Sequence, residues 1–261
     1  MIDLKDKIIL ITGASSGIGQ ACARLFAKHG AKLILCARRK DRLETLTHEL
    51  KGLYNSQCLP LILDVQDKSL VDNLLIKTLP ENWGGIDMLI NNAGLALSSD
   101  PIQQGSLENW EKMIDTNIKG LLYVTRAVLP GMIERGKGHI INIGSIAGQE
   151  CYTNGNVYCA TKFAVRALSK SMRLDLMGSP IRVTEIAPGA VETEFSEVRW
   201  DDKEKAKAFY SDFTPLFADD IADAALYCLT RPQHVDIAEM TIMPTAQAAA
   251  SQIYRAGKRL I

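Results

Sequence analysis

The sequence predicts a single-domain α/β protein of the Rossmann type, a doubly wound parallel sheet with helices on both faces. Short apolar runs alternate with longer segments of helical periodicity almost from end to end. This alternation is typical of a parallel sheet whose strands are joined by right-handed crossovers. No internal repeat, low-complexity tract or Pro/Gly/Ser-rich linker interrupts it. The whole chain, 1–261, is therefore expected to form one domain.

The elements are expected in alternating order. KIILIT (7–12) is β-branched, lies between charge and a glycine, and is too short for a helix, so it is predicted to be a buried strand. GIGQACARLFAKHG (17–30) has apolar residues at helical spacing and ends in glycine, as helices often do. Further strands are predicted at 32–37, 59–65, 86–94, 139–145, 181–189 and 238–244. Further helices are predicted at 39–50, 67–79, 107–135 and 155–177.

One segment, about 190–220, does not follow the alternation of strands and helices. It is charged, aromatic and only weakly periodic. A stretch of that length without clear structure inside a compact domain indicates a lid or binding loop. We therefore expect a substrate lid here.

The composition argues against several classes of protein. Thirty basic and thirty acidic residues cancel, so no global field favours nucleic acid or an anionic membrane. No signal peptide is evident, and no apolar stretch approaches the roughly 20 residues of a membrane span. The six cysteines show neither C-x-x-C nor the spacing of zinc ligands, so we expect reduced cysteines, no metal and a cytoplasmic location.

A glycine-rich turn, TGASSGIG (12–19), lies where the first strand gives way to the first helix. Its glycines have the spacing G-x-x-x-G-x-G, which permits a tight turn and a close approach of the backbone to a pyrophosphate at a helix N-terminus. The alternative is an ordinary strand–helix turn, but the position favours cofactor binding. The cofactor-binding candidates here are Gly13, Ser15, Ser16, Gly17, Ile18 and Gly19.

The end of the second strand predicts which nicotinamide cofactor binds. NAD enzymes generally place an acid there for the ribose 2′-hydroxyl, and this chain has no acidic residue between Asp6 and Asp41. It has Arg38 and Arg39 instead, whose guanidinium groups can pair with a 2′-phosphate. Both arginines could alternatively begin a solvated helix. The missing acid favours NADP independently of them.

Tyr158 and Lys162 share one face of a predicted helix, because they are four residues apart. The simplest explanation is a core tyrosine beside a lysine that extends to water. The functional explanation is proton transfer, since a free phenol has a pKa near 10 and a neighbouring ammonium favours its phenolate form.

Taken together, the motifs resemble the short-chain dehydrogenases/reductases over about residues 5–245. The resemblance rests on TGASSGIG, on NNAG at 91–94 and on Asn117, Ser145, Tyr158-x-x-x-Lys162, Pro188-Gly189 and Thr193 in matching order. It implies that Tyr158 is the acid/base, and that Lys162 tunes it and binds the nicotinamide ribose. Ser145 would hold the substrate oxygen, and Asn117 would position a water that links Lys162 to solvent.

The resemblance also implies further contacts to the cofactor. Asp64 and Val65 would meet the adenine, although Asp64 could also cap the following helix. The cleft and the carboxamide side would be lined by Asn91, Ala93, Gly94, Pro188, Gly189, Val191 and Thr193.

Several longer stretches resemble the NADP-dependent 3-hydroxy acid dehydrogenases that also oxidise serine and allo-threonine. They include NNAGLALSSDP, GNVYCATK and VETEFSEVRW. A small carboxylate substrate needs a cation, and Arg199 in the lid is the candidate, unless it pairs with Asp201, Asp202 or a nearby glutamate. Relatives have a glycine where this chain has Asp201-Asp202, which leaves the lid's shape open.

Two other functions compete with this one. The first is a broad carbonyl or 3-oxoacyl reductase, which would be indifferent to Arg199. The second is an NADP-binding sensor without turnover, although such proteins usually lose the Tyr, Lys or Ser that this chain keeps. By analogy with the family we also expect a homotetramer that pairs through the helices at 107–135 and 155–177, acting on a small hydroxy acid or semialdehyde.

Overall fold

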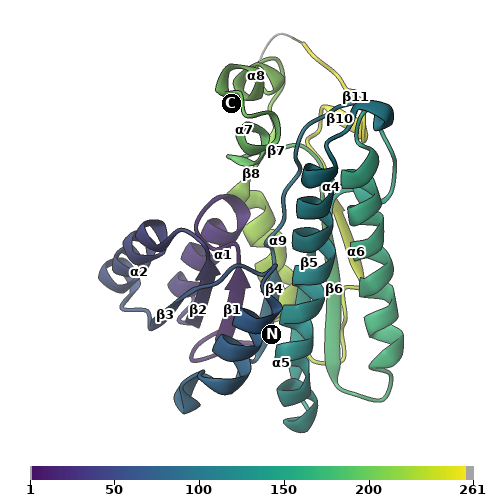
Figure 1. Ribbon diagram of the computed structural model, residues 1–261. Coiled ribbons are helices and arrows are strands. Elements are labelled where there is room, and N and C mark those ends of the chain that lie inside the picture. The colour runs from purple at the N-terminus through teal and green to yellow at the C-terminus, as the bar shows by residue number, and fades with distance from the viewer. Residues whose placement is uncertain (1, 257–261) are drawn as a thin grey trace.

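The computed structural model describes residues 2–256 and has a central sheet of seven parallel strands in the order β3-β2-β1-β4-β5-β6-β9 (Figure 1). The predicted doubly wound fold is therefore confirmed. The order reverses between β1 and β4, and ligands of such sheets bind at the carboxyl ends of the strands beside that switch point. The strands are β1 (Ile8–Thr12), β2 (Lys32–Ala37), β3 (Cys58–Ile62), β4 (Met88–Asn91), β5 (Gly138–Ile143), β6 (Ile181–Pro188) and β9 (Glu239–Ile242).

Helices cover both faces of the sheet because alternate strand residues enter two separate cores. Ile9 and Ile11 pack toward α1, α2 and α9, whereas Leu10 and Ile34 pack toward α3, α5 and α6. One face carries α1 (Gly17–Lys28), α2 (Lys40–Tyr54) and α9 (Ala218–Thr230). The other carries α3 (Lys68–Asp72) with its π-helical continuation η1 (Asn73–Lys77), α5 (Leu121–Glu134) and α6 (Asn156–Asp175), and α4 (Leu107–Ile114) extends α5 toward the lid.

The long helix predicted over 107–135 has the right extent but is not one regular helix. A π-helical turn, η4 (Asp115–Gly120), separates α4 from α5. π-Turns occur frequently at functional sites, and this one contains Asn117. Short 3₁₀ turns complete this group of elements: η2 (Glu81–Trp83), η3 (Ile102–Gln104) and η5 (Ile146–Gly148).

The lid segment is more ordered than its composition suggests. It comprises β7 (Val191–Glu192), α7 (Phe195–Trp200), α8 (Lys203–Phe209) and β8 (Leu216–Phe217), and α9 follows at once. The predicted helices did not include α9. A hairpin of β10 (Gln247–Ala249) and β11 (Gln252–Ile253) lies beyond the sheet.

The Asp201-Asp202 pair makes the turn between the two lid helices. Asp201 ends α7 in the left-handed conformation, with φ of 49°. Asp202 begins α8, and its carboxylate accepts a hydrogen bond from the backbone N–H of Lys205 at 3.0 Å. The two aspartates therefore do what a glycine C-cap and a separate N-cap would do.

A row of four polar side chains crosses the sheet beneath α6. Asn91, Asn142, Glu185 and Glu239 are register partners on β4, β5, β6 and β9, so they lie on one face. The Asn91 amide donates to the side chain of Asn142 at 2.9 Å, and Asn142 donates to Ser169 of α6 at 2.9 Å. The row is continuous from the active-site strands to the edge of the sheet.

All six cysteines are unpaired. Within residues 2–256, no group of His, Cys, Asp and Glu side chains could hold a metal ion. None of the helices described there is both long and apolar enough to cross a membrane.

Candidate active site

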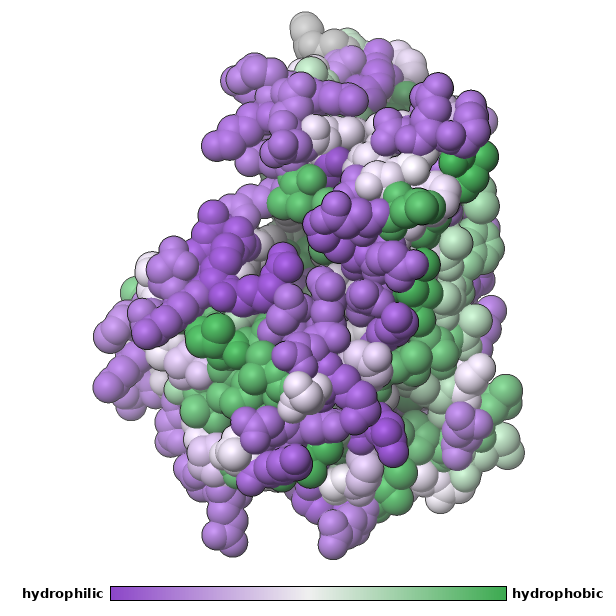
Figure 2. Space-filling model, in the orientation of Figure 1, coloured by the Kyte–Doolittle hydropathy of each residue, from purple (hydrophilic) through white to green (hydrophobic). Residues whose placement is uncertain are grey.

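A cavity of about 740 Å³ lies at the carboxyl ends of the strands, below the lid. Figure 2 shows the hollow between the hydrophilic lid and the body of the molecule. Most of the predicted site residues line this cavity, although they come from segments far apart in the sequence. They are Gly13, Ser15, Ser16, Gly17, Ile18, Arg38, Arg39, Asp64, Val65, Ala93, Gly94, Ser145, Tyr158, Lys162, Pro188, Gly189, Val191, Thr193 and Arg199.

Three predicted residues do not line it. Asn91 belongs to β4, and its amide is buried against Thr125 and Asn142. Gly19 packs against Asn92 and the turn backbone, where a Cβ would collide. Asn117 is buried behind the cavity wall.

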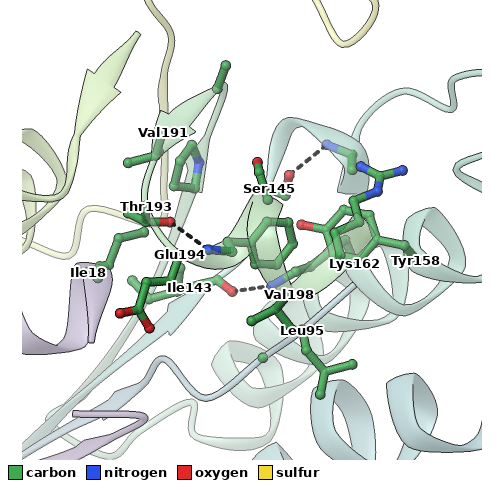
Figure 3. A pocket seen from close by; sticks show the side chains of 18 of the residues that line it. Ile18, Leu95, Ile143, Ser145, Tyr158, Lys162, Val191, Thr193, Glu194 and Val198 are labelled. Atoms are coloured by element: carbon green, nitrogen blue, oxygen red, sulfur yellow. Dashed lines mark hydrogen bonds between the residues drawn. The ribbon is translucent and has the colours of Figure 1, made fainter. Parts of the chain in front are cut away.

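Tyr158 and Ser145 come together from α6 and from the turn after β5. The Ser145 hydroxyl accepts from the backbone N–H of Ala147 at 3.1 Å and lies near enough to the Tyr158 phenol to lower its pKa. In Figure 3 these side chains lie together in the cavity. The Phe195 ring packs 5.7 Å from the Tyr158 ring, so the phenol is shielded on the lid side. The structure therefore brings Tyr158 and Ser145 together.

Lys162 is buried, and its ammonium lies beneath the same cavity. Its Nζ donates to the carbonyl of Ile143 at 2.9 Å, which is the dashed line between these two residues in Figure 3. The same Nζ lies 5.9 Å from the centre of the Tyr158 ring. Burial lowers the pKa of Lys162 to about 8, against an opposing effect of the Glu185 carboxylate. The proton on this lysine is therefore labile near neutral pH.

The lowering of the Tyr158 pKa by Lys162 together with the positive nicotinamide ring stays a prediction, and in the protein alone the pKa is raised. Burial raises the Tyr158 pKa, nearby Tyr152 adds to the rise, and hydrogen bonding to Ser145 only partly offsets them. Desolvation opposes the phenolate more strongly than these neighbours favour it. The phenol is thus protonated in the protein alone.

Asn117 reaches the site through η4. Its side-chain amide donates to the Leu95 carbonyl at 2.8 Å and to Thr161 at 3.0 Å, and its oxygen accepts from the Leu95 N–H at 2.8 Å. A Cβ on Gly94 would lie 3.3 Å from the Asn117 oxygen and 3.6 Å from Lys162 Nζ. The arrangement brings Asn117 close to Lys162 at the cavity wall.

The glycine-rich turn forms a cradle with little room for side chains. Gly13 has φ of 66° and Gly17 has φ of 53°, and a Cβ at Gly13 would meet Asn92 at 2.8 Å. The helix α1 begins at Gly17 with no side-chain cap and no acidic residue in its first turn. Uncapped N–H groups at a helix N-terminus bind anions, so this turn fits a dinucleotide pyrophosphate.

The two arginines after β2 have different surroundings. Arg39 donates to Ser15 at 3.2 and 3.3 Å and to Ser16 at 2.8 Å, so it lies over the turn. Arg38 is more exposed and lies 3.7 Å from Asp64. Helix α3 is capped by Asp67 and not by Asp64, which leaves Asp64 at the cavity.

The segment after β6 closes the opposite wall. The backbone N–H of Ala190 donates to the Gln247 side chain at 2.8 Å, and a Cβ on Gly189 would collide with that side chain. Thr193 Oγ1 accepts from the N–H of Phe195 at 3.3 Å. Gln247 has no signal in the sequence, because nothing in its local pattern indicates a partner 57 residues earlier.

Arg199 lies directly over the acid/base. Its guanidinium carbon is 5.8 Å from the Tyr158 ring centre and 5.4 Å from that of Tyr152, and Nη1 donates to the Tyr152 hydroxyl at 2.9 Å. Its backbone carbonyl accepts from Ser98 at 2.8 Å, which ties the lid to the loop after β4. In the part of the chain that the structure describes, Arg199 has no ion pair with an acid, so the pairings with Asp201 or Asp202 are wrong.

Comparison with known proteins agrees with this geometry. The model of the short chain dehydrogenase family matches residues 7–204. The NADP-dependent 3-hydroxy acid dehydrogenase YdfG of Salmonella typhi is 48% identical over 245 residues, covering 93% of this chain and 97% of that protein. Sulfoacetaldehyde reductase 2 of Chromohalobacter salexigens is 47% identical, covering 92% and 95%.

A solved structure described as the closed form of serine dehydrogenase complexed with NADP+ superposes with a TM-score of 0.89 at 47% identity. The match covers 94% of this chain and 97% of that one. The family model and these relatives extend across the sheet, the glycine-rich turn and the Tyr158/Lys162 pair. This chain belongs to the short-chain dehydrogenase family.

Proposed function

We propose that this chain is an NADP-dependent oxidoreductase that transfers a hydride between the cofactor and the 3-hydroxyl of a small 3-hydroxy acid. Candidate substrates are L-serine, L-allo-threonine, 3-hydroxypropionate and 3-hydroxyisobutyrate, and the reverse reaction reduces a semialdehyde. The observation that carries the substrate class is the position of Arg199, a cation without an acidic partner among residues 2–256, 5.8 Å from the ring of Tyr158.

The cofactor site is proposed from the cavity lining. The turn at Gly13–Gly19 would hold the pyrophosphate, Arg39 and Arg38 the 2′-phosphate, and Asp64 and Val65 the adenine side. The nicotinamide supplies the hydride chemistry when bound. Relatives whose names include NADP, and a similar structure with NADP+, support this assignment.

The residues of this chain handle the proton. Ser145 hydrogen-bonds the substrate oxygen and Tyr158 exchanges the proton with that oxygen. Lys162, whose pKa is about 8, holds positive charge beside the phenol and takes part in proton transfer toward Asn117. Because burial raises the Tyr158 pKa, the phenol donates readily only to a developing alkoxide, and the oxidative direction needs added positive charge to form the phenolate.

Arg199 is proposed to bind the substrate carboxylate. A guanidinium can form two parallel hydrogen bonds to a carboxylate, and only Nη1 and Nε of Arg199 have acceptors among the described residues. The names of two relatives indicate a hydroxy acid and sulfoacetaldehyde as substrates. Each carries an anionic group in addition to the reacting hydroxyl or aldehyde. A fixed cation above the acid/base suits both.

The test uses the purified chain with NADP or NAD and the absorbance of the reduced nicotinamide. The panel is L-serine, 3-hydroxypropionate, 3-hydroxyisobutyrate and uncharged secondary alcohols, with Tyr158→Phe as the control. Turnover of the acids with NADP, lost in the control, is expected. Reduction of bulky ketones without turnover of acids would support a broad carbonyl or 3-oxoacyl reductase instead. NADP binding without any turnover would support a sensor.

A homotetramer is proposed as the assembly. Apolar residues are exposed on α5 and α6, among them Leu122, Ile133, Phe163 and Leu174, and Figure 2 shows hydrophobic surface over these helices. A face of this kind commonly marks an interface. Light scattering should give about four times the chain mass of 28.7 kDa. We also propose a cytoplasmic location, which suits six unpaired cysteines.

A further inference from the structure

Glu194 is the acidic residue that faces the arginines of the proposed 2′-phosphate site. It stands between Thr193 and α7, at the start of the lid. Its carboxylate accepts from Arg39 Nη1 at 3.1 Å and from Arg42 Nη1 at 2.7 and 2.8 Å. In Figure 3 the carboxylate of Glu194 points away from Ser145 and Tyr158.

Folding thus supplies the acid that the sequence lacks near the second strand. No acidic residue occurs between Asp6 and Asp41, yet Glu194 arrives from 155 positions beyond Arg39. An acid in this region is what NAD enzymes use for the ribose 2′-hydroxyl. The cofactor preference therefore depends on Glu194 as well as on Arg38 and Arg39.

Four of the five N–H bonds of Arg39 have acceptors in this arrangement. Nε and Nη2 donate to Ser15, Nη2 also donates to Ser16, and Nη1 donates to Glu194. A phosphate that forms two hydrogen bonds to Arg39 must therefore replace at least one of these acceptors. Replacing the carboxylate would still leave a negative charge beside a phosphate that carries close to two negative charges.

Glu194 is charged at neutral pH. Partial burial raises its pKa, but hydrogen bonds from Arg42 and Arg39 outweigh burial, and the pKa lies below its usual value. The two bonds to Arg42 also keep the carboxylate in place when Arg39 turns to another anion. Glu194 therefore repels the phosphate in both arrangements.

We propose that Glu194 is a specificity-determining residue whose carboxylate competes with the adenosine 2′-phosphate for Arg39 and so narrows the preference for NADP over NAD. The inference rests on the proposed 2′-phosphate site. A 2′-hydroxyl carries no charge and does not need the Arg39–Glu194 bond to break. Glu194 thus weakens the phosphorylated cofactor selectively.

The experiment measures binding of two cofactor fragments by calorimetry, with no dependence on turnover. The full chain and Glu194→Gln are titrated with 2′,5′-ADP and with 5′-AMP. The glutamine keeps the side-chain length and removes the charge. We expect 2′,5′-ADP to bind about three- to tenfold more tightly to the variant, and 5′-AMP to change by less than about twofold. Unchanged or weaker binding of 2′,5′-ADP would overturn the inference.

Two further variants make the result specific. Glu197→Gln removes the same charge from α7, where no contact to Arg39 is present, and should leave the ratio of the two affinities unchanged. Arg39→Gln should weaken the binding of 2′,5′-ADP and leave the binding of 5′-AMP unchanged. If Arg39→Gln has no effect, the 2′-phosphate site itself is wrong. If Arg39→Gln weakens the binding of 2′,5′-ADP but Glu194→Gln does not strengthen it, the 2′-phosphate site is supported and only the proposed competition is wrong.

Discussion

The carboxylate of Glu185 lies directly against Gly144, so that a Cβ on Gly144 would collide with it. Gly144 joins Ile143, whose carbonyl accepts from Lys162, to Ser145. Glu185 is buried, with 1% of its surface exposed, and within residues 2–256 neither of its carboxylate oxygens has a hydrogen-bond partner. The turn that carries Ser145 therefore packs against an acid without a hydrogen-bond partner.

Gly144→Ala should destabilise the fold by about 1–3 kcal/mol, because the new methyl group overpacks the Glu185 carboxylate. In a Glu185→Ala background the same substitution should cost less than about 0.5 kcal/mol. Urea unfolding of the four proteins in this double-mutant cycle gives both values. If Gly144→Ala costs the same stability with and without the Glu185 side chain, the new methyl group does not collide with Glu185.

Glu185→Gln should gain stability relative to the native chain as the pH rises. Burial, and next the charge of Glu239, raise the Glu185 pKa from 4.5 to about 7. Between these values the folded protein holds a proton that the unfolded chain releases, so the acid costs stability as pH increases through the window. The variant lacks this cost, and its relative gain between about pH 5 and pH 8 should reach about 1–3 kcal/mol.

The check for that gain is urea unfolding at both pH values, with Glu49→Gln as the control. Glu49 pairs with Arg24 at 2.7 Å, and that hydrogen bond lowers its pKa. Its stabilising effect is present above its usual pKa of 4.5 and is lost as the pH falls below that value. The control should therefore lose a similar amount of stability at both pH values, without the pH-dependent gain of Glu185→Gln.

Arg199→Met should raise KM for a 3-hydroxy acid by about 30- to 1000-fold, since truncation of a paired charge costs several kcal/mol. An uncharged secondary alcohol should be affected by less than about threefold. Steady-state kinetics on both substrates make the comparison. Lys205→Met is the matched control, because Lys205 also lines the cavity. A larger effect of Lys205→Met would move the carboxylate to that residue.

The adjacent lid aspartates should respond with opposite signs. Asp201→Gly should stabilise the lid turn by about 0.5–1 kcal/mol, because its φ of 49° suits glycine. Asp202→Ala should cost about 1 kcal/mol, because it removes the cap on Lys205 N–H. Hydrogen exchange of α7 and α8 reports both changes locally. Equal effects of the two substitutions would contradict the assigned turn.

The alternation of strands and helices and the approach of Tyr158 to Lys162 followed from the sequence because both depend on short, local patterns. Apolar runs with glycine at their ends indicate strands, and the Tyr158-x-x-x-Lys162 spacing is a helical repeat. The strand predicted over 86–94 ends at Asn91. The Asn91 side chain donates to Thr125 and Asn142, contacts that no local pattern indicates.

The remaining features depend on packing between distant segments. The contact between Arg39 and Glu194 joins residues 155 positions apart, and that of Arg199 with Tyr152 joins two segments that have no shared pattern. The raised Tyr158 pKa follows from burial, which depends on how closely the lid covers the phenol. Helix α9 was not predicted because its first turn, with Asp219 and Asp220, continues the charged composition of the lid.

The polar row beneath α6 has a consequence for how the chain folds. Its members on β4, β5, β6 and β9 meet only when four parallel strands are in register. A slip of one residue in β6 would turn Glu185 to the opposite face of the sheet, away from Arg166, Lys162 and Arg173, whose charges favour its carboxylate in the native register. Misaligned sheets are therefore penalised before the active site exists, and an unpaired acid that weakens the native state also discourages its closest misfolded competitors.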